Sequence, residues 1–461
     1  MSILFIFTQI KQKKTYIQTH PPLGISYLIS YLKSKGLSPL GIDLLIDTEE
    51  TVYKTIADNK IEYACVSVCY RTIQTTIELS ESIKLRYPNI KIIWGGPHVE
   101  FLLDHLNQTY LDYLIFGEGE EPLYQLLTNI KNPNFNPYSI PNIAFLFNNQ
   151  ILQTPRVKPT HTLDSLPFPD REWVDINKYL KTMGPKSCYI IGSRYCPHNC
   201  SFCINSCNNN PFRSRSVPNI IEEIRFIKKT YPQYTQFFLT DETLNQSKER
   251  LVELCTALEK ENIEWTGNMR VDNYMDDKEL IELIKSSGNK FIEIGIESGS
   301  QQILNMNNKN ISLKTVDSFL KITTSLNMPV ICNFMMPHFQ DTPETLKKTM
   351  DLIMHLSANY FIVLVILRTV IMPTEKNKQI IKQYGIIATS DGTIVKTNNL
   401  PDYLINSFLS KAQEHTKKNT LKNAQKIFLS QGFDLMNSME VFNSLDFKND
   451  KSINDLLSAF L

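Results

Sequence analysis

The chain alternates short apolar, β-rich runs with segments of helical periodicity, in two consecutive series. Parallel strands that are buried on both faces have continuous apolar runs of this kind. The first series contains five runs: Ile3–Phe7, Gly41–Ile46, Ala64–Val68, Ile92–Trp94 and Tyr113–Phe116. Repeated strand–helix units predict an α/β, Rossmann-like doubly wound domain over residues 1–148, whose ligand lies beyond the carboxyl ends of the strands.

The second series contains six runs: Tyr189–Ile191, Gln236–Leu239, Ile263–Thr266, Phe291–Ile296, Val330–Met335 and Tyr360–Leu367. This series predicts a partial (β/α)6 TIM-type barrel over residues 186–375, with the active site on the loops that follow the strands. Residues 149–185 are proline-rich and aperiodic, which indicates a linker. Residues 376–461 are mostly polar with helical character, and we expect them to form a small helical region that covers the substrate.

Bulk composition excludes several classes of protein. The net charge is +1, so no basic field for nucleic acid is expected. The apolar run at residues 360–367 is far too short for a membrane span. The nine cysteines are an odd set without regular pairing, which favours a reducing, cytoplasmic location over a disulfide scaffold.

Three cysteines, Cys196, Cys200 and Cys203, follow the first strand of the second series in a Cys-x3-Cys-x2-Cys run. Three thiolates are one too few to close a tetrahedral zinc site or to bind every iron of a 4Fe–4S cluster. A cluster that is held this way keeps one iron open for a substrate or cosubstrate. The alternative is a zinc site that is completed by Cys207, His198 or Cys188.

The segment from Ser193 to Cys203 resembles the cluster loop of the radical S-adenosylmethionine (SAM) enzymes, and it matches the branch with an N-terminal cobalamin-binding domain. The resemblance covers residues 1–375. It implies three cofactors, namely a 4Fe–4S cluster on the three cysteines, SAM and cobalamin. Tyr195 departs from the family, because a glycine is common before the first cluster cysteine. The family's segment after the sixth strand is also reduced, to residues 372–374.

The same resemblance implies several residues that bind SAM. Asp241 and Glu242 end the second strand, where the family has an acidic pair near the methionine amino group. Arg270 lies in a segment like the family's third strand, and Glu297 and Ser298 end the fourth strand, facing the cosubstrate. Two plainer readings remain open: a solvated helix start for the acidic pair, and an interstrand ion pair between Arg270 and Glu297.

Segments of the first domain resemble the family's cobalamin-binding domain: residues 21–28, 95–98 and 116–120. Gly95 and Gly96 follow a strand, where they allow the nucleotide tail of cobalamin to approach the backbone, and Ser67 is expected to hydrogen-bond that tail. The Asp-x-His-x-x-Gly motif of a lower axial histidine is absent. Neither His20 nor His98 has that setting, so we expect no histidine on the lower face. The alternative is a decayed domain that only packs against the barrel.

The resemblance implies C-methylation of an unactivated carbon in a small-molecule or peptide substrate, with a flavodoxin- or ferredoxin-type electron donor. The implied chemistry starts with reductive cleavage of SAM, and methylcobalamin supplies the methyl group. No catalytic residue is assigned. Two alternatives remain: radical ring formation or rearrangement with the same cofactors, and a sensor that binds the cluster or cobalamin without turnover.

Overall fold

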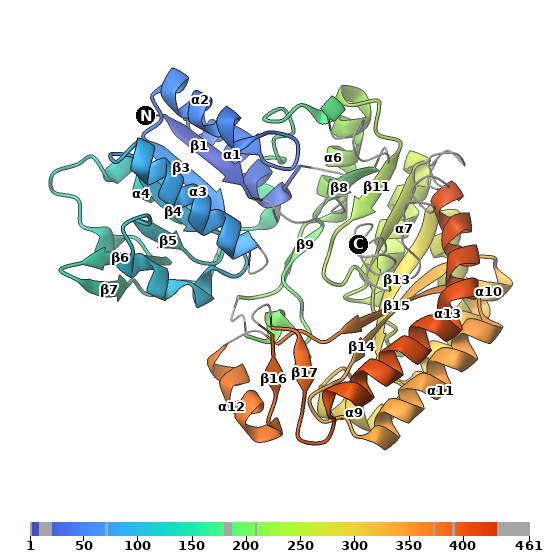
Figure 1. Ribbon diagram of the computed structural model, residues 1–461. Helices are drawn as coiled ribbons and strands as arrows, with labels where there is room; N and C mark the ends of the chain where they lie inside the picture. Colours follow the sequence, from blue (N-terminus) through green and yellow to red (C-terminus); the bar gives the residue numbers. More distant parts are fainter. Residues whose placement is uncertain are drawn as a thin grey trace. The chain divides into compact units, whose positions relative to one another are not determined.

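The computed structural model describes residues 2–8, 21–69, 72–178, 187–207, 210–371, 374–389 and 392–430. The chain divides into two compact units between residues 183 and 184 (Figure 1). Each unit is built around its own sheet.

The first unit contains a seven-stranded sheet in the order β2-β1-β3-β4-β5-β6-β7. Its strands are β1 (Ile3–Phe7), β2 (Leu40–Asp43), β3 (Tyr63–Ser67), β4 (Lys91–Gly95), β5 (Tyr113–Ile115), β6 (Ile143–Phe147) and β7 (Gln150–Gln153). The first five strands are parallel, and β6 and β7 add an antiparallel edge. An order of 2-1-3-4-5 is one of the two common doubly wound arrangements, so the predicted Rossmann-like fold is confirmed.

Helices cover both faces of this sheet. On one face lie α1 (Leu23–Ser34) and α4 (Glu120–Asn129), which contribute Ile25, Ile29 and Leu126 to one core. On the other face lie α2 (Glu49–Asn59) and α3 (Ile73–Arg86). Apolar residues recur at helical spacing on the buried side of each helix, which is why these segments fold as amphipathic helices against the sheet.

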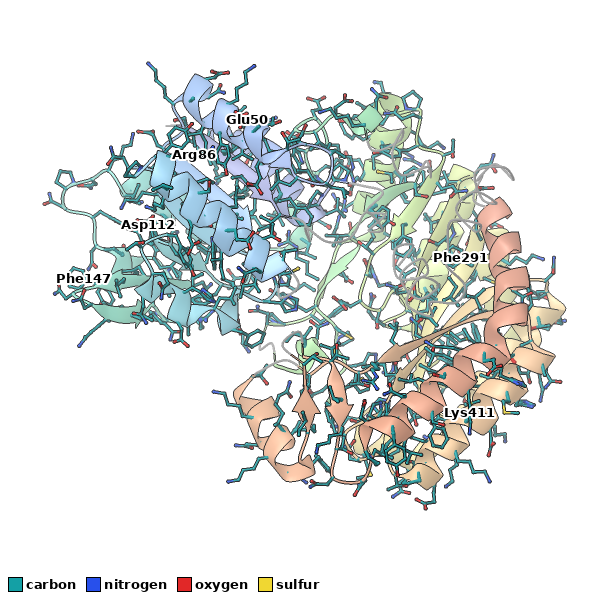
Figure 2. All side chains as sticks on the ribbon, in the orientation of Figure 1. Glu50, Arg86, Asp112, Phe147, Phe291 and Lys411 are labelled. Atoms are coloured by element: carbon teal, nitrogen blue, oxygen red, sulfur yellow. The ribbon has the colours of Figure 1, made fainter. Side chains whose placement is uncertain are left out.

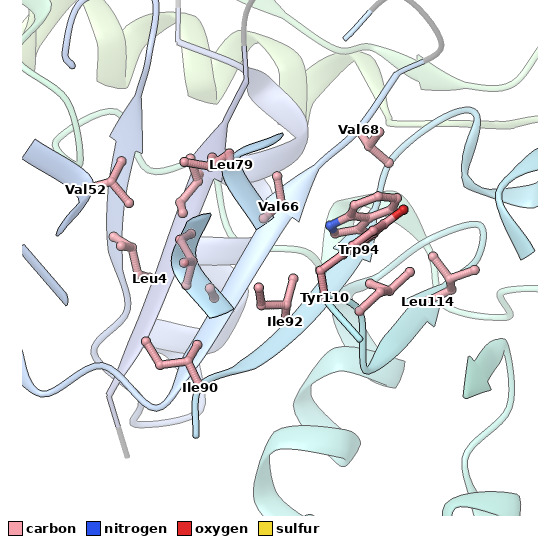
Figure 3. Packing of buried hydrophobic residues seen from close by; sticks show 14 of the residues in the cluster. Leu4, Val52, Val66, Val68, Leu79, Ile90, Ile92, Trp94, Tyr110 and Leu114 are labelled. Carbon is pink, nitrogen blue, oxygen red and sulfur yellow. The ribbon is translucent and has the colours of Figure 1, made fainter. Parts of the chain in front are cut away.

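Trp94 lies in the second of these cores (Figure 3). Its indole N–H donates to Ser80 Oγ at 3.0 Å, and its ring stacks on Tyr110 with the centroids 5.7 Å apart. The buried polar atom of Trp94 is therefore satisfied, as a stable core requires. Asp112, labelled in Figure 2, precedes β5 and accepts from both Lys84 and Lys91 at 2.7 and 2.8 Å.

The second unit contains a six-stranded parallel sheet in the order β15-β14-β13-β12-β11-β8. Its strands are β8 (Ser187–Ile190), β11 (Gln236–Leu239), β12 (Glu264–Met269), β13 (Asn289–Glu297), β14 (Val330–Met336) and β15 (Ile362–Arg368). The helices of this series are α6 (Val217–Thr230), α7 (Lys248–Glu261), α8 (Lys278–Ser286), α9 (Gln301–Met306), α10 (Leu313–Ser325) and α11 (Pro343–Asn359). Strand order follows chain order, so the predicted partial (β/α)6 barrel is confirmed.

The helices of this unit begin at strong caps. Ser216 accepts from the Asn219 backbone N–H at the start of α6, and Pro218 lies in the first turn. Thr342 and Thr345 form a capping box at the start of α11. Such caps satisfy backbone donors that a helix leaves unpaired, and they determine where each strand-to-helix loop ends.

The C-terminal region contains α12 (Glu375–Tyr384), a small antiparallel pair of β16 (Ile387–Ala388) and β17 (Ile394–Lys396), and α13 (Asp402–Ser430). Helix α13 packs along α11 and β15 (Figure 1). Residues 431–461 lie outside the described residues, as do residues 372 and 373. The β6–β7 hairpin spans residue 148, where the linker was expected to begin, and the exact domain limits stay predictions. Among the described helices, none is both long and apolar enough to cross a bilayer.

Candidate functional site

The cysteine loop leaves β8 at the carboxyl edge of the barrel sheet. It is closed by β9 (Ser193–Arg194), which pairs antiparallel with β10 (Arg213–Ser214). Within the loop the Cys203 N–H donates to the Cys200 carbonyl at 3.0 Å. Burial raises the pKa of the Cys203 thiol to about 11, and the nearby charges of Glu242, Cys200 and Cys196 add to that rise. The three thiols therefore lie close enough to influence one another.

Two polar groups reach the thiols from the loops that follow β11 and β12. Thr243 Oγ1 lies 3.7 Å from the Cys196 sulfur, and Arg270 Nη1 donates to the buried Cys200 sulfur at 3.6 Å. The loop is anchored on the other side by Ser201, whose hydroxyl donates to Asn307 Oδ1 at 2.7 Å. These contacts hold the loop and leave all three cysteines as free thiols, which fits a cluster that binds through sulfur.

The structure explains why the residue before the first cysteine matters. Tyr195 has a φ of 65°, in the left-handed region that normally favours glycine. Its phenol oxygen accepts from Asn210 Nδ2 at 2.8 Å. A tyrosine therefore occupies the conformation in which the family commonly has glycine.

Asp241 fixes the point where the loop leaves the strand. Its Oδ1 accepts from the backbone N–H groups of Gly192 and Ser193 at 2.6 and 3.0 Å. A Cβ on Gly192 would lie 3.0 Å from Asp241 Oδ2, so glycine permits this close approach. Complete burial raises the pKa of Asp241 to about 6 despite these hydrogen bonds. Contact between Asp241 and SAM stays a prediction.

Glu242, the second acidic residue, is exposed and lies near the cysteine loop. The surrounding protein partly desolvates it and raises its pKa, whereas a hydrogen bond from the Asn205 side chain acts in the opposite direction. The helix-start reading of this acidic pair is wrong, because α7 begins only at Lys248 with Ser247 as its cap. Glu242 is therefore the member of the pair that is available to a ligand.

The backbone of Arg270 is held through both its N–H group and its carbonyl group. Asn245 accepts from the Arg270 N–H at 2.8 Å and donates to its carbonyl at 2.7 Å. The Arg270 side chain is 5% exposed, and its Nε donates to Asp272 Oδ1 at 2.8 Å. Arg270 thus pairs with Asp272, and the suggested interstrand ion pair with Glu297 is wrong.

Glu297 ends β13 at a register shift, with a φ of 68°. Its Oε1 accepts from Lys309 Nζ at 3.0 Å, and both side chains are 10% exposed. A Cβ on Gly295 would lie 2.0 Å from the same oxygen, so the carboxylate folds back over that glycine. The left-handed backbone and the buried lysine together fix where this carboxylate points.

Sequence reasoning missed Lys309 and His338. His338 is 1% exposed, and its Nε2 lies 3.3 Å from the Glu297 carbonyl oxygen. Its ring lies 5.3 Å from that of Phe202 in the cysteine loop, and its N–H donates to Asp341 Oδ2 at 2.7 Å. His338 thus links the end of β13 to the cysteine loop. Its position just after the fifth strand, where barrel enzymes place site residues, was the sequence feature that could have identified it.

Ser298 is a buried turn residue beside Glu297. Its hydroxyl lies 3.2 Å from Thr349 Oγ1 and accepts from the Ser300 N–H at 3.1 Å. These contacts give Ser298 a structural task, and its contact with SAM stays a prediction.

In the first unit, Ser67 and Gly95 are paired neighbours at the carboxyl ends of β3 and β4. Gly96 has a φ of 124°, and a Cβ there would lie 2.4 Å from the Val68 carbonyl oxygen. His98 follows at the start of a short 3-10 helix (Val99–Phe101). The structure therefore brings Ser67, Gly95 and Gly96 together at the edge where doubly wound sheets bind ligands. His20 lies outside the described residues.

The zinc alternative has no geometric support among the described residues. No three His, Cys, Asp or Glu side chains converge closely enough there to bind one metal ion. A tetrahedral zinc site needs such convergence, whereas cysteines that bind different irons of one cluster lie further apart. The side chain of Cys207 is outside the described set.

Comparisons with known families agree with this geometry. Residues 190–353 match the Radical SAM superfamily, and residues 14–127 match the B12 binding domain. The former implies a 4Fe–4S cluster and SAM, and the latter implies cobalamin.

Similar proteins differ in their reactions. An uncharacterized methyltransferase of Pyrococcus horikoshii is 24% identical over 78% of this chain and 79% of its own. The anaerobic magnesium-protoporphyrin IX monomethyl ester cyclase of Rubrivivax gelatinosus is 24% identical over 76% of this chain and 65% of its own. The structure of the radical SAM methyltransferase TsrM from Kitasatospora setae, with cobalamin and a 4Fe–4S cluster bound, has a TM-score of 0.69 at 14% identity. It covers 84% of this chain and 79% of that one, and shows a shared fold.

Proposed function

Since the chain belongs to the cobalamin-dependent radical SAM enzymes, we propose that it methylates an unactivated carbon of a small-molecule or peptide substrate. The observation that carries this proposal is the gathering of three thiols on one loop, beside an exposed Glu242 and an oriented Arg270. Similarity to a methyltransferase of Pyrococcus horikoshii favours methyl transfer as the outcome.

In this proposal Cys196, Cys200 and Cys203 bind the cluster, and the first unit binds cobalamin along Ser67, Gly95 and Gly96. The bound cofactors supply the one-electron chemistry and the methyl group. Glu242 has the charge and exposure to accept hydrogen bonds from the ammonium group of SAM.

The remaining residues of the site position these groups. Asp241 holds the exit of the loop, and Lys309 holds the carboxylate of Glu297. His338 buttresses Phe202 in the loop and the backbone of Glu297. A fixed arrangement of this kind lowers the entropy that is lost when SAM and substrate are oriented for reaction.

Ring formation or rearrangement with the same cofactors is the second candidate, because the chain is similar to a cyclase. Methyl transfer forms S-adenosylhomocysteine beside 5′-deoxyadenosine, whereas the second candidate forms 5′-deoxyadenosine alone. A sensor would turn over no SAM with any reductant. A flavodoxin- or ferredoxin-type donor, a cytoplasmic location and a substrate cover within residues 376–461 belong to the same proposal.

The test is anaerobic reconstitution with iron, sulfide and hydroxocobalamin, followed by metal and corrin analysis and SAM turnover under reduction. We expect about four irons and one corrin per chain, with both adenosine products formed. Replacing Cys196, Cys200 or Cys203 by Ala removes iron and turnover, whereas Cys255→Ala, in the buried face of α7, retains both. Iron without corrin overturns the methyl-transfer proposal.

A further inference from the structure

The two faces of the barrel sheet differ in polarity along the later parts of β12 and β13. Trp265 on β12 points to the helices, because its indole N–H donates to Ser287 Oγ at 3.1 Å, at the end of α8. From the middle of β13 onward, the helix-facing residues Ile292, Ile294 and Ile296 are all fully buried and apolar, whereas Asn289 at the start of the strand is a buried polar residue on that face. Side chains alternate along a strand, so Thr266 and Asn268 point to the opposite, inner face.

Polar residues continue along this inner face from strand to strand. Asn268 of β12 is the register partner of Glu293 of β13, and partners in a parallel sheet share a face. Asn333 of β14 is the partner of Gly295, two residues beyond Glu293, so it also lies on the inner face. We call Thr266, Asn268, Glu293 and Asn333 the inner row.

The inner row has more hydrogen-bond acceptors than the protein satisfies. Among the described residues, no partner reaches the buried atoms Thr266 Oγ1, Asn268 Oδ1 and Asn333 Oδ1. Thr266 is 4% exposed. The one contact within the row runs from Asn333 Nδ2 to Glu293 Oε1. Buried polar atoms without partners destabilise a fold, and the interior of a (β/α) barrel is normally filled by branched apolar residues.

Charge and neighbouring rings narrow the type of group that fits. Glu293 is 8% exposed, and among the described residues it forms no ion pair, whereas Glu297 is paired with Lys309. Thr266 lies between its register partners Phe238 and Phe291, and Phe291 is labelled in Figure 2. Burial raises the pKa of Glu293 to about 7. An adjacent cation would act in the opposite direction, lowering this pKa and favouring the ionised carboxylate.

We infer that the inner row binds an ammonium group of the substrate. Amide, hydroxyl and carboxyl oxygens accept its N–H donors, the carboxylate neutralises its charge, and the flanking rings suit a cation. Glu293 precedes Glu297 by four residues, about 13 Å of extended strand, so the ammonium end lies deeper in the barrel than the strand-end groups. This inference rests on the proposed function, and it names the substrate class as amines.

The test uses the reconstituted full chain and saturation-transfer NMR with three separate probes, propylammonium, 1-propanol and propionate. We expect propylammonium to bind at least about tenfold more tightly than the other two, and Glu293→Gln to weaken it at least about tenfold. Glu264→Gln on the neighbouring strand is the matched control, since Glu264 pairs with Lys290 outside the inner row. The control should leave binding unchanged.

Equal binding of all three probes, no binding of propylammonium, or an unchanged affinity in Glu293→Gln overturns the inference. SAM turnover in the same samples separates it from the proposed function. Turnover without amine binding refutes the ammonium site and leaves the enzyme proposal standing. Amine binding without turnover shows that the inner row binds an ammonium group, but it refutes the enzyme proposal and with it the assignment of that group to a substrate.

Discussion

Arg270 Nη1 lies 3.6 Å from the sulfur of Cys200 and donates a hydrogen bond to it. The guanidinium is buried and is also tied to Asp272. A cation that donates to a thiolate stabilises negative charge on that sulfur. If Cys200 holds the cluster, Arg270 would therefore influence how readily that cluster accepts an electron.

Replacing Arg270 by Gln is expected to shift the midpoint potential of the reconstituted cluster to a more negative value. The reduced cluster carries more negative charge, so it loses more stabilisation than the oxidised form. A redox titration followed by electron paramagnetic resonance measures the shift. Arg225→Gln is the control, because Arg225 pairs with Glu261 at the surface. Equal potentials in the wild type and Arg270→Gln would refute this role.

The two glycines after β4 should respond differently to alanine. At Gly96 an added Cβ meets the Val68 carbonyl at 2.4 Å and the φ is 124°, so Gly96→Ala should lose at least about 2 kcal/mol of stability. At Gly95 the nearest atom would be 3.9 Å away, so Gly95→Ala should retain the fold. Urea unfolding measures both.

The same pair tests the cobalamin site. If the nucleotide tail approaches Gly95 closely, Gly95→Ala lowers the corrin content of the reconstituted protein while its unfolding midpoint stays near that of the wild type. Full corrin content in a stable Gly95→Ala protein would remove Gly95 from the proposed site.

Asp241 should make stability depend on pH. Burial raises its folded-state pKa from 3.8 to about 6. The stabilisation that protonated Asp241 gives the folded protein is therefore fully present below pH 4. As the pH rises towards 6 and above, the free energy of unfolding falls by up to about 3 kcal/mol. Asp241→Asn cannot ionise, so its stability relative to the wild type should increase across this interval. Urea unfolding of both apoproteins from pH 4.5 to 7 measures this, and parallel profiles would contradict the assignment.

Lys309 and Glu297 should be strongly coupled. Lys309→Met leaves a buried carboxylate unpaired and should destabilise the protein by about 3 kcal/mol, and adding Glu297→Gln should restore part of that loss. A double-mutant cycle in urea unfolding gives the coupling energy. Lys321→Met breaks an exposed pair with Asp317 and should change stability by no more than about 0.5 kcal/mol. If Lys309→Met loses as little stability as this control, the ion pair between Lys309 and Glu297 contributes little to the stability of the protein.

The strands could be predicted because buried parallel strands have continuous apolar runs. Observed β11 has the predicted bounds, and observed β12 differs from its prediction by at most three residues. The β6–β7 and β16–β17 hairpins were not predicted, since their short strands have no distinctive pattern. Element type was therefore more predictable than the small additions at the sheet edges.

Residue types placed the site at the ends of strands, but they did not separate the roles within it. Asp241 and Glu242 are adjacent acids, yet one is buried on backbone donors and the other is exposed. Lys309 and His338 reach Glu297 from loops after α9 and β14, so only the three-dimensional fold brings them there. Side-chain direction and tertiary neighbours decide these roles, and a single sequence records neither.

Tyr195 determines how the cysteine loop is assembled. A glycine at this position would give the backbone after β9 a wider choice of conformations. The tyrosine restricts that choice, and its hydrogen bond to Asn210 anchors the turn from outside the cysteine run. The protein's own folding therefore restricts the turn that leads into the three cysteines, independently of any metal.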